Sequence, residues 1–70
     1  MKPLADQLEC AQRELGLRQR TYPKWVAQGR ITEAKAQHEI ECMSSIVESI
    51  KKLKMLEEVS QEMQESQPFD

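Results

Sequence analysis

A chain of 70 residues with a formal net charge of −2 can form one domain at most and has no overall attraction for nucleic acid. A monomer of this length buries little surface, so disulfides, a metal or oligomerisation usually add stability. The two cysteines, Cys10 and Cys42, and the single histidine, His38, lack a zinc-ligand spacing, so we expect no metal and no cofactor, which leaves oligomerisation.

The N-terminal residues resemble neither a signal peptide nor a membrane span. The stretch "LADQLECAQREL" carries charges throughout, and no long apolar run follows it. We therefore expect a cytosolic protein with reduced thiols and no membrane partner.

The first predicted helix runs from about Pro3 to Thr21, because proline suits a first helical turn. Its seam has spacings of four and three residues and is apolar except at one arginine: Leu4, Leu8, Ala11, Leu15, Arg18 and Tyr22. Gly16 lies in the middle of this helix and costs about 1 kcal/mol relative to alanine. It is either a tolerated weakness or a site where another helix approaches closely.

The stretch "RTYPKWVAQGRIT", residues 20–32, predicts a corner between two helices and holds the only Trp and the only Tyr. Pro23 should end the first helix, because the residue before a proline is pushed out of the α region. Gly29 supplies a position where φ can be positive, and Thr32 is a good N-cap.

The second predicted helix runs from Glu33 to about Glu65 and contains no Gly or Pro. One apolar seam consists of Ala36, Ile40, Met43, Val47 and Ile50. A neighbouring, mostly apolar seam consists of Glu39, Cys42, Ile46, Ile50 and Leu53. Together they form a stripe that is wide enough for two partners.

The two predicted helices differ in length, at roughly 28 Å and roughly 50 Å. Folded back antiparallel, Leu8 lies at the level of Ile46 and Leu4 at that of Ile50, so the chain beyond about Lys52 has no intramolecular neighbour. That overhang still carries apolar residues: Leu53, Met55, Leu56, Val59 and Met63. An exposed apolar stripe of this kind usually marks an interface.

We therefore predict an all-α antiparallel two-helix hairpin, with a short first and a long second helix, that is homodimeric through the second helix. The single domain spans residues 1–66, and residues 67–70 form a frayed tail. The centre of the dimer interface is predicted at Ile46, Val47, Ile50 and Leu53.

The groups with catalytic potential are few. His38 and Cys42 are spaced i, i+4 and could form a thiolate–imidazole pair, but two helices supply neither an oxyanion hole nor a concave pocket, so we expect no enzyme. The predicted pairing also places Cys10 near Cys42. They are either adjacent buried small side chains or, under oxidising conditions, a disulfide.

Charge is distributed unevenly along the chain. Residues 13–35 hold six basic and two acidic residues, whereas residues 57–70 hold five acidic residues and no basic one. A small DNA- or RNA-associated regulator is therefore an alternative, although helix two opens with acidic residues where a recognition helix would present basic ones. The acidic segment either mimics DNA or keeps the protein soluble.

The aromatic residues of the corner have two compatible interpretations. Tyr22 and Trp25 can cap the hairpin core, or they can anchor a protein-binding tip with a charged rim. The predicted contacts at this tip are Arg18, Arg20, Tyr22, Lys24, Trp25 and Arg30. A second predicted patch consists of Met55, Leu56 and Val59.

Residues 14–53 resemble a group of small proteins encoded by phages and prophages. In that group an Arg-rich helix end precedes Tyr-Pro-x-Trp-Val, then Gly-Arg, then a helix with spaced Ala, Glu-Ile and Met. The matching residues here are Arg18, Arg20, Tyr22, Pro23, Trp25, Val26, Gly29, Arg30, Ala36, Glu39, Ile40, Met43 and Ile46.

The chain is also similar to a Pseudomonas phage anti-activator that binds a LuxR-type quorum-sensing regulator. This resemblance implies a dimeric helical hairpin that acts in the bacterial host cytoplasm and inhibits a host protein by binding to it. A structural coiled-coil component of virion assembly is a further alternative.

Overall fold

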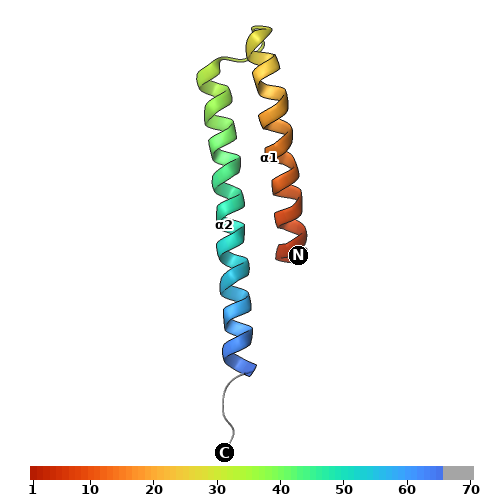
Figure 1. The fold of residues 1–70 in the computed structure, drawn as a ribbon, viewed down its shortest axis with the longest axis vertical. Helices are drawn as coiled ribbons and strands as arrows, with labels where there is room; N and C mark the ends of the chain where they lie inside the picture. Colours follow the sequence, from red (N-terminus) through yellow and green to blue (C-terminus); the bar gives the residue numbers. More distant parts are fainter. Residues whose placement is uncertain (66–70) are drawn as a thin grey trace, which may run out of the picture.

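The computed structural model describes residues 1–65, with side chains through Gln61, and consists of two packed α-helices (Figure 1). Helix α1 spans Leu4–Ala27 and helix α2 spans Glu33–Glu65. They run antiparallel along each other, which confirms the predicted all-α hairpin, and the second helix begins at Glu33 as predicted. The predicted tail at 67–70, residue 66 at the domain boundary and the side chain of Met63 lie outside this description.

Helix α1 is longer than predicted, because it does not end at Pro23. Pro23 lies inside the helix, which continues to Ala27 and reaches 24 residues, so the prediction of a short first helix is wrong. A proline inside a helix costs about 3 kcal/mol, since it removes a hydrogen bond and its ring crowds the carbonyl four residues earlier. The contacts formed by the residues after Pro23 offset this cost.

A Schellman motif ends α1 at Gly29, which has a φ of 72°. The Gly29 N–H donates to the carbonyl of Val26 at 3.0 Å, and the Arg30 N–H donates to the carbonyl of Trp25 at 2.9 Å. These are the two bonds that define the motif, and they satisfy carbonyls that the helix end would otherwise leave unpaired. The predicted positive φ at Gly29 is confirmed.

The N-terminus of α2 is capped as predicted. The Thr32 Oγ1 accepts a hydrogen bond from the Lys35 backbone N–H at 3.1 Å, and Glu33 lies in the first turn. Only five residues separate α1 from α2, so the two caps together reverse the chain within a short corner.

The core lies between the two helices. Ala11, Met43 and Val47 are buried in one cluster, and Leu8, Leu15 and Ile50 pack against it. Every residue of the predicted α1 seam and of the first α2 seam is buried or half-buried: Leu4, Leu8, Ala11, Leu15, Arg18, Tyr22, Ala36, Ile40, Met43, Val47 and Ile50. The helical periodicity therefore identified the inner faces of both helices.

Helix α2 extends well past the N-terminus of α1, whereas the last turn of α1 rises beyond the start of α2 (Figure 1). The predicted overhang is therefore present, and the four extra residues of α1 after Pro23 extend the opposite end of the hairpin. Gly16 does not mark a close helix contact within the hairpin, since a Cβ there would meet only the Arg20 Nη1, at 3.4 Å.

Candidate functional site

The end of α1 presents a stacked group of three side chains. The rings of Tyr22 and Trp25 stack with centroids 5.3 Å apart and an interplanar angle of 25°. The Arg30 guanidinium carbon lies 5.9 Å from the Trp25 ring centroid, which is within the range of a cation–π contact. The Schellman motif places Arg30 there, because its two outer positions bring the side chains of Trp25 and Arg30 together. We call these three residues the aromatic tip.

The aromatic tip is part buried and part exposed. Tyr22 is half-buried, while Trp25 keeps 37% of its surface exposed. The stack thus lies at the end of the hairpin and leaves part of the indole exposed. The predicted rim residues Arg20, Lys24 and Arg30 are all exposed, so the tip is cationic.

Beside the aromatic tip lies a shallow depression of about 210 Å³ that includes a residue missing from the predicted contact set. Its lining is Glu14, Leu17, Arg18, Thr21, Tyr22 and Trp25. Leu17 is 45% exposed, although it is a large apolar residue in the middle of a helix. The sequence could have indicated this exposure, because Leu17 comes one residue before the seam residue Arg18. An apolar side chain just off a seam lacks a partner within the hairpin.

Arg18 was predicted to contact a partner, but the hairpin itself uses its guanidinium. The Nη1 donates to the backbone carbonyl of Glu39 at 2.9 Å, and the Nε donates to the Glu14 carboxylate at 3.0 Å. The hydrogen bond to Glu14 raises the pKa of Arg18, partial burial opposes this, and electrostatic interactions with Tyr22, Glu14 and Glu39 add to the rise. We therefore assign Arg18 to the polar connection between α1 and α2.

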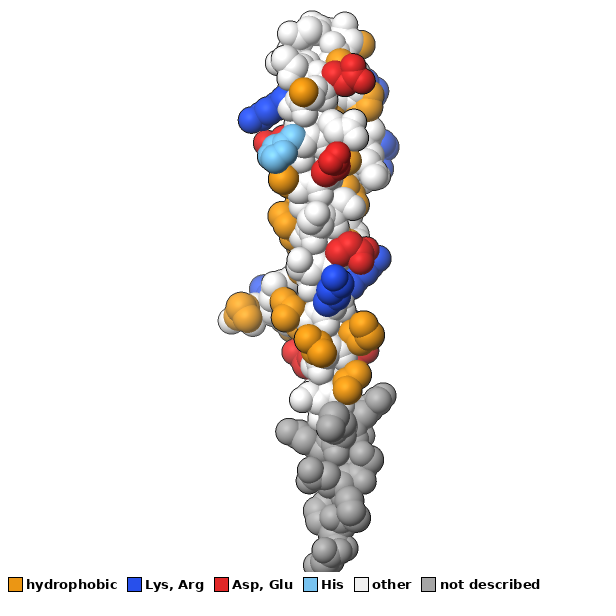
Figure 2. Space-filling view, turned by 90° about the vertical axis from the view of Figure 1, so that its left-hand side faces the viewer, with side chains coloured by type: hydrophobic (Ala, Val, Ile, Leu, Met, Phe, Trp, Pro, Cys, Tyr) orange, Lys and Arg blue, Asp and Glu red, His pale blue; other side chains and the backbone are white. Residues whose placement is uncertain are grey.

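The second predicted surface lies on the outer side of α2. Figure 2 shows hydrophobic side chains gathered on this helix just above the residues drawn in grey. Among the side chains of α2 through Gln61, the large apolar ones that are exposed are Ile46, Leu53, Met55, Leu56 and Val59, at 43–64% exposure. The three residues of the predicted second patch, Met55, Leu56 and Val59, are therefore accessible in the hairpin.

Two of the predicted dimer residues belong to the interior of the hairpin. Val47 is 4% exposed in the core, and Ile50 is half-buried against that core. They are buried because of their position around the helix axis: residues 43, 47 and 50 lie on the face of α2 that α1 covers. Ile46 and Leu53 lie beside this face and remain exposed, so an intermolecular contact would use them and not Val47.

No family model, curated protein or solved structure matches the chain. The resemblance to small phage proteins therefore depends on the corner motif in the sequence. Within this motif the structure brings Tyr22, Trp25 and Arg30 together at one end of the hairpin.

The thiols and the histidine lie at the surface. The expectation that Cys10 and Cys42 are buried neighbours is wrong, since both are exposed, free thiols. The cause is that both lie one residue before a buried seam residue, Ala11 or Met43. The Cys42 Sγ lies 3.5 Å from the His38 Nε2, and both side chains are exposed on the outside of α2.

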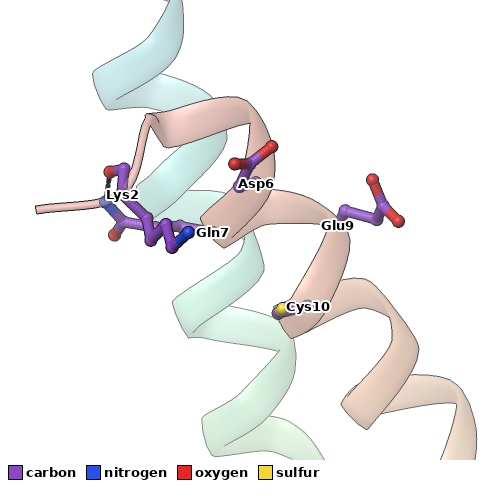
Figure 3. A pocket seen from close by; sticks show the side chains of 5 residues that line it. All are labelled: Lys2, Asp6, Gln7, Glu9 and Cys10. Atoms are coloured by element: carbon purple, nitrogen blue, oxygen red, sulfur yellow. Dashed lines mark hydrogen bonds between the residues drawn. The ribbon is translucent and has the colours of Figure 1, made fainter.

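A further depression of about 410 Å³ lies against the N-terminal part of α1 (Figure 3). Gln7 is turned back onto Lys2, whose carbonyl accepts a hydrogen bond from the Gln7 Nε2 at 2.6 Å. The carboxylates of Asp6 and Glu9 point away from this pair (Figure 3). Among the described residues, no group of three His, Cys, Asp or Glu side chains could hold a metal ion.

The basic segment is partly neutralised within the hairpin. Arg13 pairs with Glu9 at 3.1 Å, and Lys35 lies 3.9 Å from the Glu39 carboxylate. Together with Arg18, half of the six basic residues between 13 and 35 thus have acidic neighbours. No helix in the described part of the chain has the length and apolarity needed to cross a membrane.

Proposed function

We propose that this chain is a non-enzymatic, homodimeric helical hairpin of a phage or prophage that binds a bacterial host protein and inhibits it. The observation that carries the proposal is the aromatic tip, in which a partly exposed Trp25 contacts both Tyr22 and Arg30. Two further parts of the proposal, a bacterial host protein as the target and the host cytoplasm as the location, rest on the resemblance to phage proteins.

The aromatic tip has the composition and rigidity of a binding hot spot. Trp, Tyr and Arg are the residues most enriched at such spots. Here the stacking contacts and the Schellman motif hold the side chains before binding, which reduces the entropy lost on association. Leu17 extends the apolar contact area beside Trp25.

The charge of the tip indicates the chemistry of the target surface. Arg20, Lys24 and Arg30 surround Trp25 and are exposed, so the complementary surface is acidic with an apolar recess for the indole. A LuxR-type transcriptional regulator is the target that the resemblance implies. Binding would then cover a surface that the regulator needs for DNA binding or dimerisation.

The outer side of α2 provides a reason for self-association. Its exposed apolar side chains extend past the end of α1, where the same chain offers no cover. A second copy that packs on this surface would bury it through a two-fold, self-complementary interface.

Substitution at the aromatic tip tests the proposed inhibition. A tagged chain is used to capture proteins from bacterial lysate, and the captured protein is then purified and assayed with and without the hairpin. We expect Trp25→Ala to weaken the complex by at least about 30-fold, which corresponds to a hot spot of about 2 kcal/mol. Gln61→Ala, an exposed residue remote from the tip, is the matched control.

Other outcomes distinguish the alternatives. A nucleic-acid regulator would retard an oligonucleotide in a gel, and the retardation would fade steeply with salt. A virion component would appear in purified particles. Unchanged binding and inhibition by Trp25→Ala, with helicity preserved by circular dichroism, would overturn the role of the aromatic tip.

A further inference from the structure

Two side chains that commonly bind metal ions lie one helical turn apart on the outside of α2. His38 and Cys42 are both exposed, and their i, i+4 spacing makes them neighbours on the same side of the helix. The Cys42 Sγ lies 3.5 Å from the His38 Nε2. Cysteine sulfur and imidazole nitrogen are the ligands that zinc and related divalent ions prefer. We call these two residues the His–Cys pair.

The separation of the two ligand atoms matches that in a metal site. Zinc lies about 2.3 Å from a cysteine sulfur and about 2.0–2.1 Å from a histidine nitrogen, with tetrahedral geometry. At a tetrahedral angle, these bond lengths put the sulfur and the nitrogen about 3.6 Å apart. The His–Cys pair holds nearly this separation through its own contact, so little side-chain freedom is lost when an ion binds.

The charges around His38 favour a cation. Its ring lines an open depression together with Glu33 and Glu41, and the described residues that line this depression include no Lys or Arg. Lys35, the basic residue closest to His38 in the sequence, lies 3.9 Å from the Glu39 carboxylate and so has an acidic neighbour. The two carboxylates of the depression therefore give the surface beside the ring a negative potential.

We propose that the His–Cys pair binds one thiophilic divalent cation per hairpin, and that zinc is the ion that fits it. The cysteine gives up its thiol proton and binds as a thiolate, while the neutral imidazole binds through Nε2. Because both side chains are exposed, water molecules complete the coordination. Such an open site with two protein ligands does not need the four-ligand spacing that the chain lacks. This inference does not depend on the proposed inhibition of a host protein.

Cobalt titration tests the site, because a bond between Co²⁺ and a thiolate gives a charge-transfer absorption band. The Cys10→Ser variant, which keeps only the Cys42 thiol, is titrated with cobalt chloride in the presence of a phosphine reductant. We expect the band to saturate at one ion per chain. Zinc should remove it, since zinc binds such ligands more tightly than cobalt, whereas calcium should not, since calcium prefers oxygen ligands.

Variants of the Cys10→Ser chain assign the ligands. Cys42→Ser should abolish the band. His38→Gln should weaken cobalt binding by at least about tenfold, a loss that is typical of even an outer-shell partner of a metal. Ser44→Ala, at an exposed position that belongs to neither ligand, is the matched control and should bind cobalt like the Cys10→Ser chain.

Thermal stability gives a second measurement that does not use cobalt. An ion that joins two consecutive turns of α2 stabilises the folded chain, so zinc should raise the melting temperature of the Cys10→Ser chain. It should leave that of the chain without either thiol unchanged. The site would be overturned by the absence of a band, by a band that persists without Cys42, or by unchanged affinity in His38→Gln. An endpoint of one ion per two chains would overturn the single-hairpin stoichiometry, because two copies would then share the ion.

Discussion

Arg18 is the residue that ties the two helices together through polar contacts. Its guanidinium reaches the Glu14 carboxylate on its own helix and a backbone carbonyl of α2, that of Glu39. A planar group with several fixed donors can make both bonds, whereas the single ammonium of lysine cannot. An arginine at a seam position therefore replaces apolar packing with a bridge between helices.

Arg18→Lys should lower the free energy of unfolding by about 1–2 kcal/mol, which is typical of a lost hydrogen bond to a charged group. Urea denaturation followed by circular dichroism measures this loss, and Arg20→Lys, at an exposed position, is the control. The hydrogen bond to Glu14 raises the pKa of Arg18. The charged guanidinium therefore contributes fully to the free energy of unfolding at neutral pH, and this contribution is lost only in strongly alkaline solution. An unchanged urea midpoint would contradict the bridging role.

The two glycines should respond to alanine in opposite ways. Gly16 has helical surroundings and room for a Cβ beside the Arg20 side chain, so Gly16→Ala should stabilise the hairpin by up to about 1 kcal/mol. Gly29 has a φ of 72°, so Gly29→Ala should destabilise it by about 1–2 kcal/mol despite open space around the site. Thermal melts of both variants provide the comparison, and a loss of stability in Gly16→Ala would reveal a helix packed there from another copy.

At the scale of the element, the last turn of α1 is helical although Pro23 disfavours a helix at this position. Pro23 disfavours helix, yet four residues continue it and bring Trp25 to Tyr22 and Arg30. The Schellman motif then ends the helix at Gly29, where the backbone reaches positive φ without a side-chain clash.

Pro23→Ala should therefore stabilise the hairpin, by about 1–3 kcal/mol, because it restores a helical hydrogen bond and removes a steric conflict. The aromatic tip should be unaffected, so target binding should stay the same. Chemical denaturation measures the first effect, and binding of the captured host protein measures the second. A decrease in stability would show that the pyrrolidine ring is needed for packing against Val26 and Ile40, with which it shares a groove.

At the scale of the whole molecule, the hairpin has a thin core and a large exposed apolar side. Within the described residues, four apolar side chains are buried, while five large ones on α2 remain exposed. Each exposed aliphatic side chain that becomes fully buried contributes about 1.5–3 kcal/mol. A second copy is therefore expected to supply much of the stability of the folded chain.

Leu53→Glu should abolish self-association, because it places a charge in the exposed apolar surface of α2 that a second copy would cover. Leu53 is 54% exposed in the hairpin, so the substitution acts mainly on the intermolecular contact. We expect the melting temperature of the unmodified chain to rise with protein concentration and that of the variant to be lower and constant. Gln37→Glu adds the same charge near the start of α2, far from Leu53, and should behave like the unmodified chain.

Much of the hairpin follows from local patterns. Apolar spacing marked the inner faces of both helices, and the absence of Gly and Pro from 33 to 65 gave the bounds of α2. The caps at Gly29 and Thr32 were also recognisable, because each depends on one residue type at one position. These features involve neighbours within a few residues, and so the order of amino acids is sufficient to predict them.

Other features depend on which surfaces meet in space. The continuation of α1 past Pro23 depends on the stack of Tyr22, Trp25 and Arg30. The use of Arg18 within the hairpin depends on its hydrogen bond to the carbonyl of Glu39, 21 residues away. The angular position around α2 likewise separated buried Val47 from exposed Ile46, which are adjacent in the chain. A wide apolar stripe is compatible with several packing directions, and only the position of α1 selects the side that stays exposed.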